Sequence, residues 1–398
     1  KYMAKQLFSI DEVRKELKKV NQFGDIIANS EYTKVKEYIG SGNYHLNALF
    51  SGDLFRGIPC NRGIAVAGES GVGKTFFMLN IAREAQKMGY YIIYYDSEGA
   101  IDADTVTSFD VDTTKFDHQP VSDLAKFRTS ITTLIKKLVE AKEKGFEIPK
   151  LAIFLDSLGM LATTKEIDDA ISGNTAADMT RAKMIRSLFR IITADLAGLG
   201  IPLIFSSHTY ASTGMFPTIN LSGGGGLIYA PSIIINLTKA KLKEGAIQTG
   251  IIVTATALKN RYVKPQSIKL HIRWDRGMNP YVGMEEYISW DVCGIQKGNI
   301  LTEKEWDKLN DKDKSQSREF EVNGEKRYFM PKETARNFIV KHLGEGIHAS
   351  KLFTKEVFTN EVLQLINEKC IKPKFTYGLD DEISDGEIDD FLLNSEEE

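Results

Sequence analysis

One eight-residue segment restricts the possible folds of this chain more than any other. Gly68-Glu69-Ser70-Gly71-Val72-Gly73-Lys74-Thr75 matches the pattern G-x-x-x-x-G-K-[ST], in which a glycine-rich loop turns its backbone N–H groups toward phosphates. In this pattern Lys74 reaches the β- and γ-phosphates, and the Thr75 hydroxyl binds Mg²⁺. An apolar segment precedes the loop, and residues with helical spacing follow it. The sequence therefore predicts a strand–loop–helix unit that binds a nucleoside triphosphate with Mg²⁺.

The rest of the pattern predicts an α/β fold. Four segments are apolar without alternation, which indicates parallel strands that are buried on both faces. They are 63–67, 90–95, 151–155 and 201–206. Helices are expected at 75–87, 122–144 and 178–198. Three later strands with short connections are 232–237, 250–257 and 267–274. We expect these later strands to extend a mostly parallel, helix-flanked sheet in antiparallel fashion.

The pattern also divides the chain into four parts. Residues 1–40 form a small helical region, because Ser9-Ile-Asp-Glu12 is a capping box followed by apolar residues at helical spacing. The α/β core spans 41–284. A smaller domain spans 285–378, with a hairpin turn at Asn323-Gly324 and two or three short helices over 332–371. We expect the acidic tail, 379–398, to be disordered.

The distribution of charge is compatible with a nucleic-acid partner. The formal net charge is −3, but residues 380–398 carry ten acidic groups and no basic ones. The rest of the chain therefore has 51 basic and 44 acidic groups. A mildly basic body with an acidic tail suits nucleic-acid binding, and a solvated tail without any partner is the alternative.

Neither a membrane span nor a disulfide framework is expected. No apolar run approaches the ~20 residues that cross a bilayer, and no secretory signal is recognisable. Cys60, Cys293 and Cys370 are isolated and lack the spacing of metal ligands. We therefore expect buried free thiols in a reducing compartment.

Polar side chains follow three of the predicted buried strands. Asp156 can bind Mg²⁺, although an aspartate in this place can also cap a helix. Glu98 can orient and deprotonate an attacking water, or it is a surface carboxylate. His208 can sense the γ-phosphate, or its role is structural. Because ligands of open α/β sheets bind at the carboxyl edge, we expect these groups to meet Lys74 and Thr75 there.

The predicted helix at 178–198 has a cationic face beside two polar segments, 163–177 and 210–226. Its cations within one face are Lys183, Arg186 and Arg190. Apolar residues, Ile191 among them, are expected on the opposite side. Long irregular segments in a compact domain are usually functional or disordered. The cationic face could follow a phosphate backbone, or it is simply solvated.

Two further features could contact nucleic acid or nucleotide. Phe216 and Tyr210, in the second polar segment, could stack on bases or wedge between them. Lys259 and Arg261 are separated by one residue and point the same way on an extended chain. They could clamp phosphates, including those on an adjacent subunit, or they protect an exposed edge strand.

These elements, in this order, resemble the RecA recombinase family from about residue 41 to 283. Asp96-Ser97-Glu98-Gly99 is similar to the segment that holds the family's catalytic glutamate. Lys259-Asn260-Arg261 is similar to the paired cations that reach ATP across the subunit interface. Leu155-Asp-Ser-Leu-Gly159 and His208-Thr-Tyr210 are most similar to the branch of the family found in T-even-like bacteriophages.

The resemblance implies a recombinase that uses ATP and Mg²⁺ and hydrolyses the β–γ bond in a DNA-dependent way. Subunits would polymerise on single-stranded DNA into a helical filament, which pairs with homologous double-stranded DNA and exchanges strands. It also implies a recombination mediator and a single-strand-binding protein as partners, in the cytoplasm of a bacterial host. The alternatives are a ring helicase or a signalling ATPase on the same fold, and a mediator that does not hydrolyse ATP.

The resemblance also assigns residues to these roles. Lys183 and Arg190 would contact the DNA backbone, and the two polar segments would line the DNA channel. The second segment contributes Phe216, Gly223 and Gly224. Residues 1–40 would dock onto a neighbouring subunit. The chain departs from the family at Thr105, where a tyrosine often stacks on adenine, and at His208, where RecA itself has glutamine.

Overall fold

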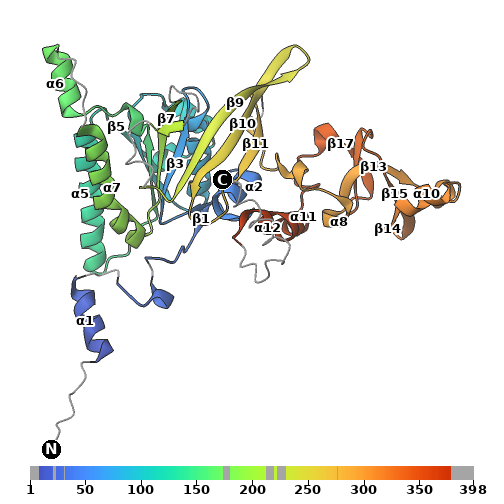
Figure 1. The fold of residues 1–398 in the computed structure, drawn as a ribbon, viewed down its shortest axis with the longest axis horizontal. Helices are drawn as coiled ribbons and strands as arrows, with labels where there is room; N and C mark the ends of the chain where they lie inside the picture. Colours follow the sequence, from blue (N-terminus) through green and yellow to red (C-terminus); the bar gives the residue numbers. More distant parts are fainter. Residues whose placement is uncertain are drawn as a thin grey trace, which may run out of the picture.

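The strand that leads into the glycine-rich loop, β3 (Gly63–Gly68), lies inside a large mixed sheet in the computed structural model (Figure 1). The structure describes residues 9–20, 24–30, 32–173, 180–211, 219–221, 230–275 and 277–377. Within these ranges, ten strands form the sheet in the order β12-β11-β10-β9-β3-β7-β6-β4-β5, with β8 paired to β7.

The parallel part of the sheet confirms the four predicted buried strands. From β9 to β5, each strand pairs in parallel with its neighbour. The strands around β3 are β4 (Tyr91–Asp96), β5 (Phe116–Pro120), β6 (Leu151–Asp156) and β7 (Leu203–Ala211). Sequence analysis did not predict β5, because its segment Phe-Asp-His-Gln-Pro lacks an apolar run.

Antiparallel strands extend the sheet beyond β9, as predicted, but the segment expected at 232–237 lies in β9, which runs parallel to β3 and antiparallel only to β10. A long hairpin of β9 (Ile233–Glu244) and β10 (Ile247–Asn260) rises beyond the rest of the sheet (Figure 1). The other antiparallel strands are β8 (Ile219–Leu221), β11 (Ser267–Arg273) and β12 (Gly277–Met278).

Helices cover both faces of the sheet. The side chains of β3 alternate between the hydrophobic clusters on these two faces. Ile64 and Val66 pack with α3, whereas Ala65 and Ala67 pack with α5 and α7. The three helices are α3 (Lys74–Lys87), α5 (Leu124–Glu143) and α7 (Thr180–Leu199). Each matches a helix predicted from the sequence. Helices α5 and α7 lie side by side (Figure 1).

One of the short helices outside these two layers lies in a segment that the sequence predicts to be irregular. The first predicted polar segment contains a helix, α6 (Thr164–Ser172), which begins with a capping box between Thr163 and Glu166. Residues 174–177 of that segment lie outside the described ranges. The other short helices and strands of the core are α2 (Tyr44–Ser51), α4 (Ala103–Ser108), β1 (Tyr38–Ile39) and β2 (Ile58–Pro59).

The N-terminal helix α1 (Ile10–Val20) confirms the predicted capping box, since the backbone N–H of Ser9 donates to Glu12 and that of Glu12 donates to the Ser9 hydroxyl. Its apolar residues are exposed in a single copy of the chain; Ile10 is 73% exposed and Val20 91%. The helix therefore adds little to the core of its own subunit.

A second sheet follows the core, in the order β14-β15-β13-β16-β17. Its strands are β13 (Ile295–Leu301), β14 (Arg318–Val322), β15 (Glu325–Pro331), β16 (Asn337–Val340) and β17 (Glu345–His348). The predicted Asn323-Gly324 turn joins β14 to β15, with positive φ at both residues. The prediction of helices from 332 onward is wrong for the first part of that range, where β16 and β17 form a hairpin.

Helices complete this C-terminal part. They are α8 (Trp290–Cys293), α9 (Glu303–Trp306), α10 (Asp311–Gln316), α11 (Asn360–Ile366) and α12 (Lys372–Phe375). Side chains from α11 and α12, such as Ile366 and Phe375, are buried in the same cluster as α2 and α3. The end of the described chain thus packs back onto the main core.

Thiols and helix lengths bear on two further expectations. The three cysteines are free; Cys60 and Cys293 are buried as predicted, and Cys370 is partly exposed. In the described part of the chain, no helix is long and apolar enough to span a bilayer. The acidic tail, Phe216, Gly223 and Gly224 lie outside the described ranges.

Candidate nucleotide site and nucleic-acid interface

The glycine-rich loop leaves β3 at the carboxyl edge of the sheet and runs directly into α3. Gly71 and Gly73 have φ values of 70° and 103°, in the left-handed region that glycine adopts without strain. Helix α3 then begins at Lys74. Its unpaired N–H groups and the positive end of its dipole point at the space above the loop, which makes an anion site.

Lys74 lies inside this loop. Its side chain is nearly buried, and Nζ donates to the carbonyl oxygens of Gly68 and Glu69 at 3.1 and 3.0 Å. Burial lowers the pKa of Lys74, and the charges of Glu98 and Asp156 oppose that shift. The ammonium group is therefore held in the concave part of the loop, as the motif predicts.

Thr75 and Asp156 meet at the start of α3. The Thr75 hydroxyl donates to Oδ2 of Asp156 at 2.6 Å, and the carboxylate is 2% exposed. Tyr94 donates to the same oxygen at 3.0 Å, and Ser206 donates to the other one. A hydroxyl and a carboxylate beside a phosphate-binding loop are hard oxygen donors, so these residues fit Mg²⁺.

Glu98 and His208 complete the group at the carboxyl edge. Nε2 of His208 lies 3.0 Å from Oε1 of Glu98, and its Nδ1 lies 3.3 Å from Nζ of Lys74. The strands that precede these residues are neighbours in the order β3-β7-β6-β4. The expectation that four strand ends bring Lys74, Thr75, Glu98, Asp156 and His208 together is therefore met by the geometry, whereas their chemical roles stay predictions.

Lys259 and Arg261 lie at the opposite edge of the sheet. Strand β10 runs antiparallel to β9, and Asn260 near its end pairs with Ile233 at the start of β9. The two cations therefore flank the amino edge, whereas the glycine-rich loop lies at the carboxyl edge. Burial, and then the charge of Arg261, lower the pKa of Lys259. One copy of the chain therefore cannot bring these two cations and its own glycine-rich loop to a single nucleotide.

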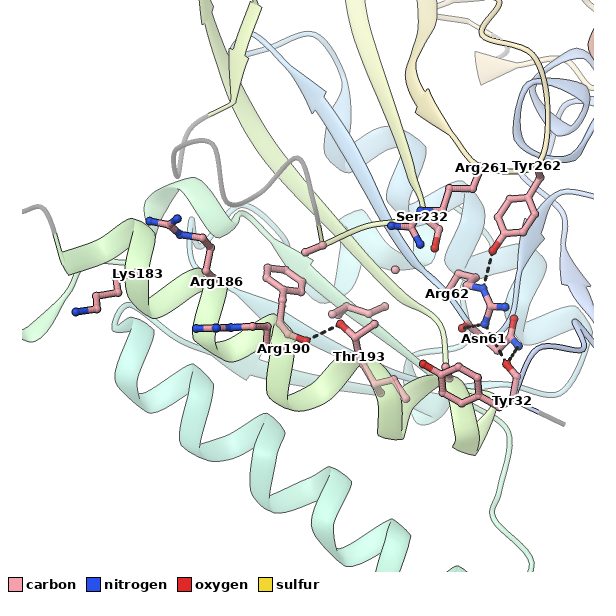
Figure 2. Close-up of a pocket in the computed structure, with 16 residues that line it drawn as sticks. Tyr32, Asn61, Arg62, Lys183, Arg186, Arg190, Thr193, Ser232, Arg261 and Tyr262 are labelled. Carbon is pink, nitrogen blue, oxygen red and sulfur yellow. Dashed lines mark hydrogen bonds between the residues drawn. The ribbon is translucent and has the colours of Figure 1, made fainter. Parts of the chain in front are cut away.

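A cavity of about 850 Å³ opens at this amino edge, between α7 and the strands. Figure 2 shows Lys183, Arg186 and Arg190 along α7 and Arg261 across the cavity from them. All three helix cations are exposed, which agrees with the predicted cationic face. Most of the apolar face is buried as expected, but Met184 is only partly buried, and Ile191 is 41% exposed and lies next to the cations.

Sequence analysis missed several residues that fix this geometry. Arg62 donates from Nε to the Tyr262 hydroxyl at 2.5 Å and from one terminal nitrogen to the carbonyl oxygen of Tyr32 (Figure 2). Its other terminal nitrogen donates to the carbonyl oxygen of Thr33. It thus joins the segment before the core to the loop that contains Arg261. In the sequence, only the position of Arg62 directly before β3, among uncharged residues, could have indicated this role.

Lys239 was missed as well. Its Nζ donates to the carbonyl oxygen of Gly71 in the glycine-rich loop at 2.6 Å. Strand β9 pairs with β3 through Leu237 and Gly68, which brings Lys239 to the loop. This contact depends on the pairing of two strands that are far apart in sequence, so local patterns could not have predicted it.

Thr105, the departure from the family pattern, lies in α4 and donates its backbone N–H to Asp102 at 2.7 Å. Tyr210 is on β7 and is 56% exposed. The roles of both side chains stay predictions.

A glycine-rich loop between a buried strand and a helix, with a threonine–aspartate pair and a glutamate at the same edge, defines a P-loop nucleotide-binding protein. The family model of the RecA N-terminal domain matches residues 9–279 of this chain. The chain therefore belongs to the RecA family.

Known relatives agree with this assignment. Over 258 residues the chain is 30% identical to the "Recombination and repair protein" of Enterobacteria phage T4, and the match covers 64% of each protein. It is 24% identical to the "Protein RecA" of Thermus aquaticus over 282 residues, 69% of this chain and 78% of the relative. It is 26% identical to the "Protein RecA" of Mycoplasma genitalium over 261 residues, 64% of this chain and 71% of the relative.

Proposed function

We propose that this protein is an ATP-dependent DNA recombinase, which assembles on single-stranded DNA and exchanges strands with homologous double-stranded DNA. The observation that supports this most strongly is the convergence of Lys74, Thr75, Glu98 and Asp156 at one sheet edge in a member of the RecA family. The phage relative named for recombination and repair supports the same proposal.

In this proposal the glycine-rich loop and Lys74 bind the triphosphate of ATP, and Thr75 and Asp156 hold Mg²⁺. The metal ion neutralises charge on the phosphates when it is bound. Glu98 accepts a proton from the attacking water and orients it. His208 bridges Glu98 and Lys74, so it is suited to report the loss of the γ-phosphate to the strand β7 on which it lies.

The placement of Lys259 and Arg261 supports an assembly of subunits. Because they lie at the amino edge, they would reach the triphosphate bound at the carboxyl edge of an adjacent copy. A repeated contact between two different surfaces generates a helical filament when the rotation does not close. Residues 1–40, with the exposed apolar face of α1, would add to the same contact.

DNA binding is assigned to the cationic face of α7, with Lys183, Arg186 and Arg190, and to Phe216, Gly223 and Gly224. Three exposed cations around one cavity suit a polyanion, and their contacts would make binding depend on salt. A recombination mediator and a single-strand-binding protein are the further partners that we propose, in the cytoplasm of a phage-infected host.

An ATPase assay with and without single-stranded DNA, with the nucleotide products resolved, tests this proposal. We expect Mg²⁺-dependent release of ADP from ATP that single-stranded DNA stimulates. Turnover that does not respond to DNA would contradict the recombinase function and favour a signalling ATPase. ATP binding without turnover would favour a mediator, and closed rings instead of filaments in electron microscopy would favour a helicase.

A further inference from the structure

The backbone that carries Glu98 is held by a second carboxylate, Asp96. Asp96 ends β4 and is 4% exposed. Its Oδ1 accepts the backbone N–H groups of Glu98 and Gly99 at 2.9 and 2.8 Å. The direction in which the Glu98 side chain leaves the strand end therefore depends on where the Asp96 carboxylate points.

The other oxygen of Asp96 faces a histidine on the edge strand. Nε2 of His118, on β5, lies 3.1 Å from Oδ2 of Asp96. Strand pairing places the histidine, because β5 runs parallel to β4 with Tyr94 opposite His118. The backbone N–H of Val121, just after β5, also donates to the carbonyl oxygen of Asp96 at 2.8 Å. Asp96 is thus held by β5 through both its side chain and its main chain.

A stabilising role alone is a poor explanation for this contact. The His118 side chain is 41% exposed, so water can replace it as a donor to Asp96, and the contact contributes little to stability. The contact instead fixes the orientation of a buried carboxylate whose second oxygen holds the turn at Glu98. From His118, the contacts continue through Asp96 and Glu98 to His208 and Lys74.

We propose that His118 is a positioning residue for Glu98. Through Asp96, it holds the turn at residues 97–99 so that the Glu98 carboxylate faces His208 and the space above the glycine-rich loop. His118 does not touch the nucleotide in this proposal. The inference rests on the proposed role of Glu98 in ATP hydrolysis.

The test compares His118→Leu, which removes the hydrogen bond, with His118→Gln, whose Nε2 can still donate to Asp96. Gln119→Ala is a matched control, because the next residue on β5 points to the other face of the sheet and bonds Asp117 instead. For each full-length variant, kcat and KM for ATP are measured at saturating single-stranded DNA. Binding of a non-hydrolysable ATP analogue and the melting temperature are measured as well.

We expect His118→Leu to lower kcat about tenfold, the usual effect of losing one hydrogen bond to a charged group. KM and analogue binding should stay within about twofold, because Lys74 and the loop are untouched. His118→Gln should recover most of kcat, and Gln119→Ala should match the parent.

Three results would overturn the inference. The first is an unchanged kcat in His118→Leu. The second is an equal loss of kcat in His118→Leu and His118→Gln. The third is a loss of analogue binding together with kcat; the second and third would mean a general disturbance of the sheet edge. A parent protein without ATP turnover would instead contradict the proposed function itself, so that the two failures are distinguishable.

Discussion

The Glu98 carboxylate and the His208 ring, 110 residues apart in sequence, face each other at 3.0 Å on neighbouring parts of one sheet edge. The same ring lies 3.3 Å from the ammonium group of Lys74. A proposed catalytic base, a proposed sensor and the lysine of the glycine-rich loop are therefore in one hydrogen-bonded row. The row makes each residue's role testable separately.

Replacing Glu98 by glutamine should stop turnover while leaving binding intact. The amide keeps the size of the side chain and can still contact His208, but it cannot accept a proton. We expect ATP hydrolysis to fall by about 10²–10⁴-fold, with analogue binding and single-stranded DNA binding unchanged. Lys74→Ala serves as the contrasting variant, because it should abolish nucleotide binding. Undiminished hydrolysis in Glu98→Gln would remove Glu98 from the mechanism.

Replacing His208 separates a sensor from a structural histidine. His208→Gln retains a donor for Glu98, whereas His208→Leu retains only bulk. We expect DNA-stimulated hydrolysis to persist in His208→Gln and to lose most of its DNA dependence in His208→Leu, measured as the ratio of rates with and without single-stranded DNA. An unchanged ratio in His208→Leu, with normal nucleotide binding, would argue for a structural role.

Two defective variants should restore each other when mixed. Lys74→Ala lacks a working loop but has intact cations, and Arg261→Ala has the reverse defect. When the two variants are mixed in equal amounts, roughly a quarter of the interfaces combine a working loop from one subunit with intact cations from its neighbour. We therefore expect the mixture to have activity that neither variant has alone. The measurement is DNA-stimulated ATP hydrolysis against mixing ratio. A mixture as inactive as its parts would place Arg261 outside the site of a neighbour.

Stability should fall in mild acid because of His45. The residue is fully buried, with Nε2 2.8 Å from the Tyr287 hydroxyl, and burial lowers its pKa to about 3. The unfolded chain takes up this proton near pH 6.5, whereas the folded chain does not until about pH 3. The contribution is therefore fully present above pH 6.5 and is lost as the pH falls from 6.5 toward 3.

Chemical denaturation between pH 7.5 and 4.5 checks this expectation. Below pH 6, His45→Gln should lose stability less steeply than the parent, by up to about 1.4 kcal/mol per pH unit. Parallel slopes for the parent and His45→Gln would contradict the prediction.

The cysteines should differ in reactivity. Burial raises the pKa of Cys60 to about 11 and raises that of Cys293, so both thiols are protonated and inaccessible at neutral pH. Cys370 is partly exposed. We expect a thiol reagent to label Cys370 first and the other two only in denaturant, with Cys370→Ser unlabelled in the native state. Fast labelling of all three in the native protein would refute this.

The carboxyl edge could be predicted from the sequence because the strands that carry the candidate residues are apolar runs followed directly by polar residues. Glu98, Asp156 and His208 were identified on that basis alone. The residues that orient them were not identified. Ser206 and Tyr94 are within the apolar runs, and their contacts with Asp156 depend on which strands are neighbours.

The edge strand β5 could not be predicted because it is half-exposed and holds Asp117 and His118 in place of apolar residues. Its structure comes from pairing with β4, which is a tertiary effect. The polar sequence of helix α6 favours a loop, although its capping box is a local signal for a helix. Strands β16 and β17 are each four residues long, which is too short for the spacing of apolar residues to distinguish a strand from a helix.

Strand β9 has a consequence for how sites in an array communicate. It starts at Ile233, which pairs with Asn260, the residue between Lys259 and Arg261 in the sequence. About 20 Å further along the strand, Lys239 donates to the glycine-rich loop. In the proposed filament, this strand spans from the half-site that a subunit would offer to one neighbour to the half-site that it would share with the other. Sliding of β9 by a fraction of an ångström would alter both junctions at once, so occupancy at one nucleotide would bias the next along the polymer.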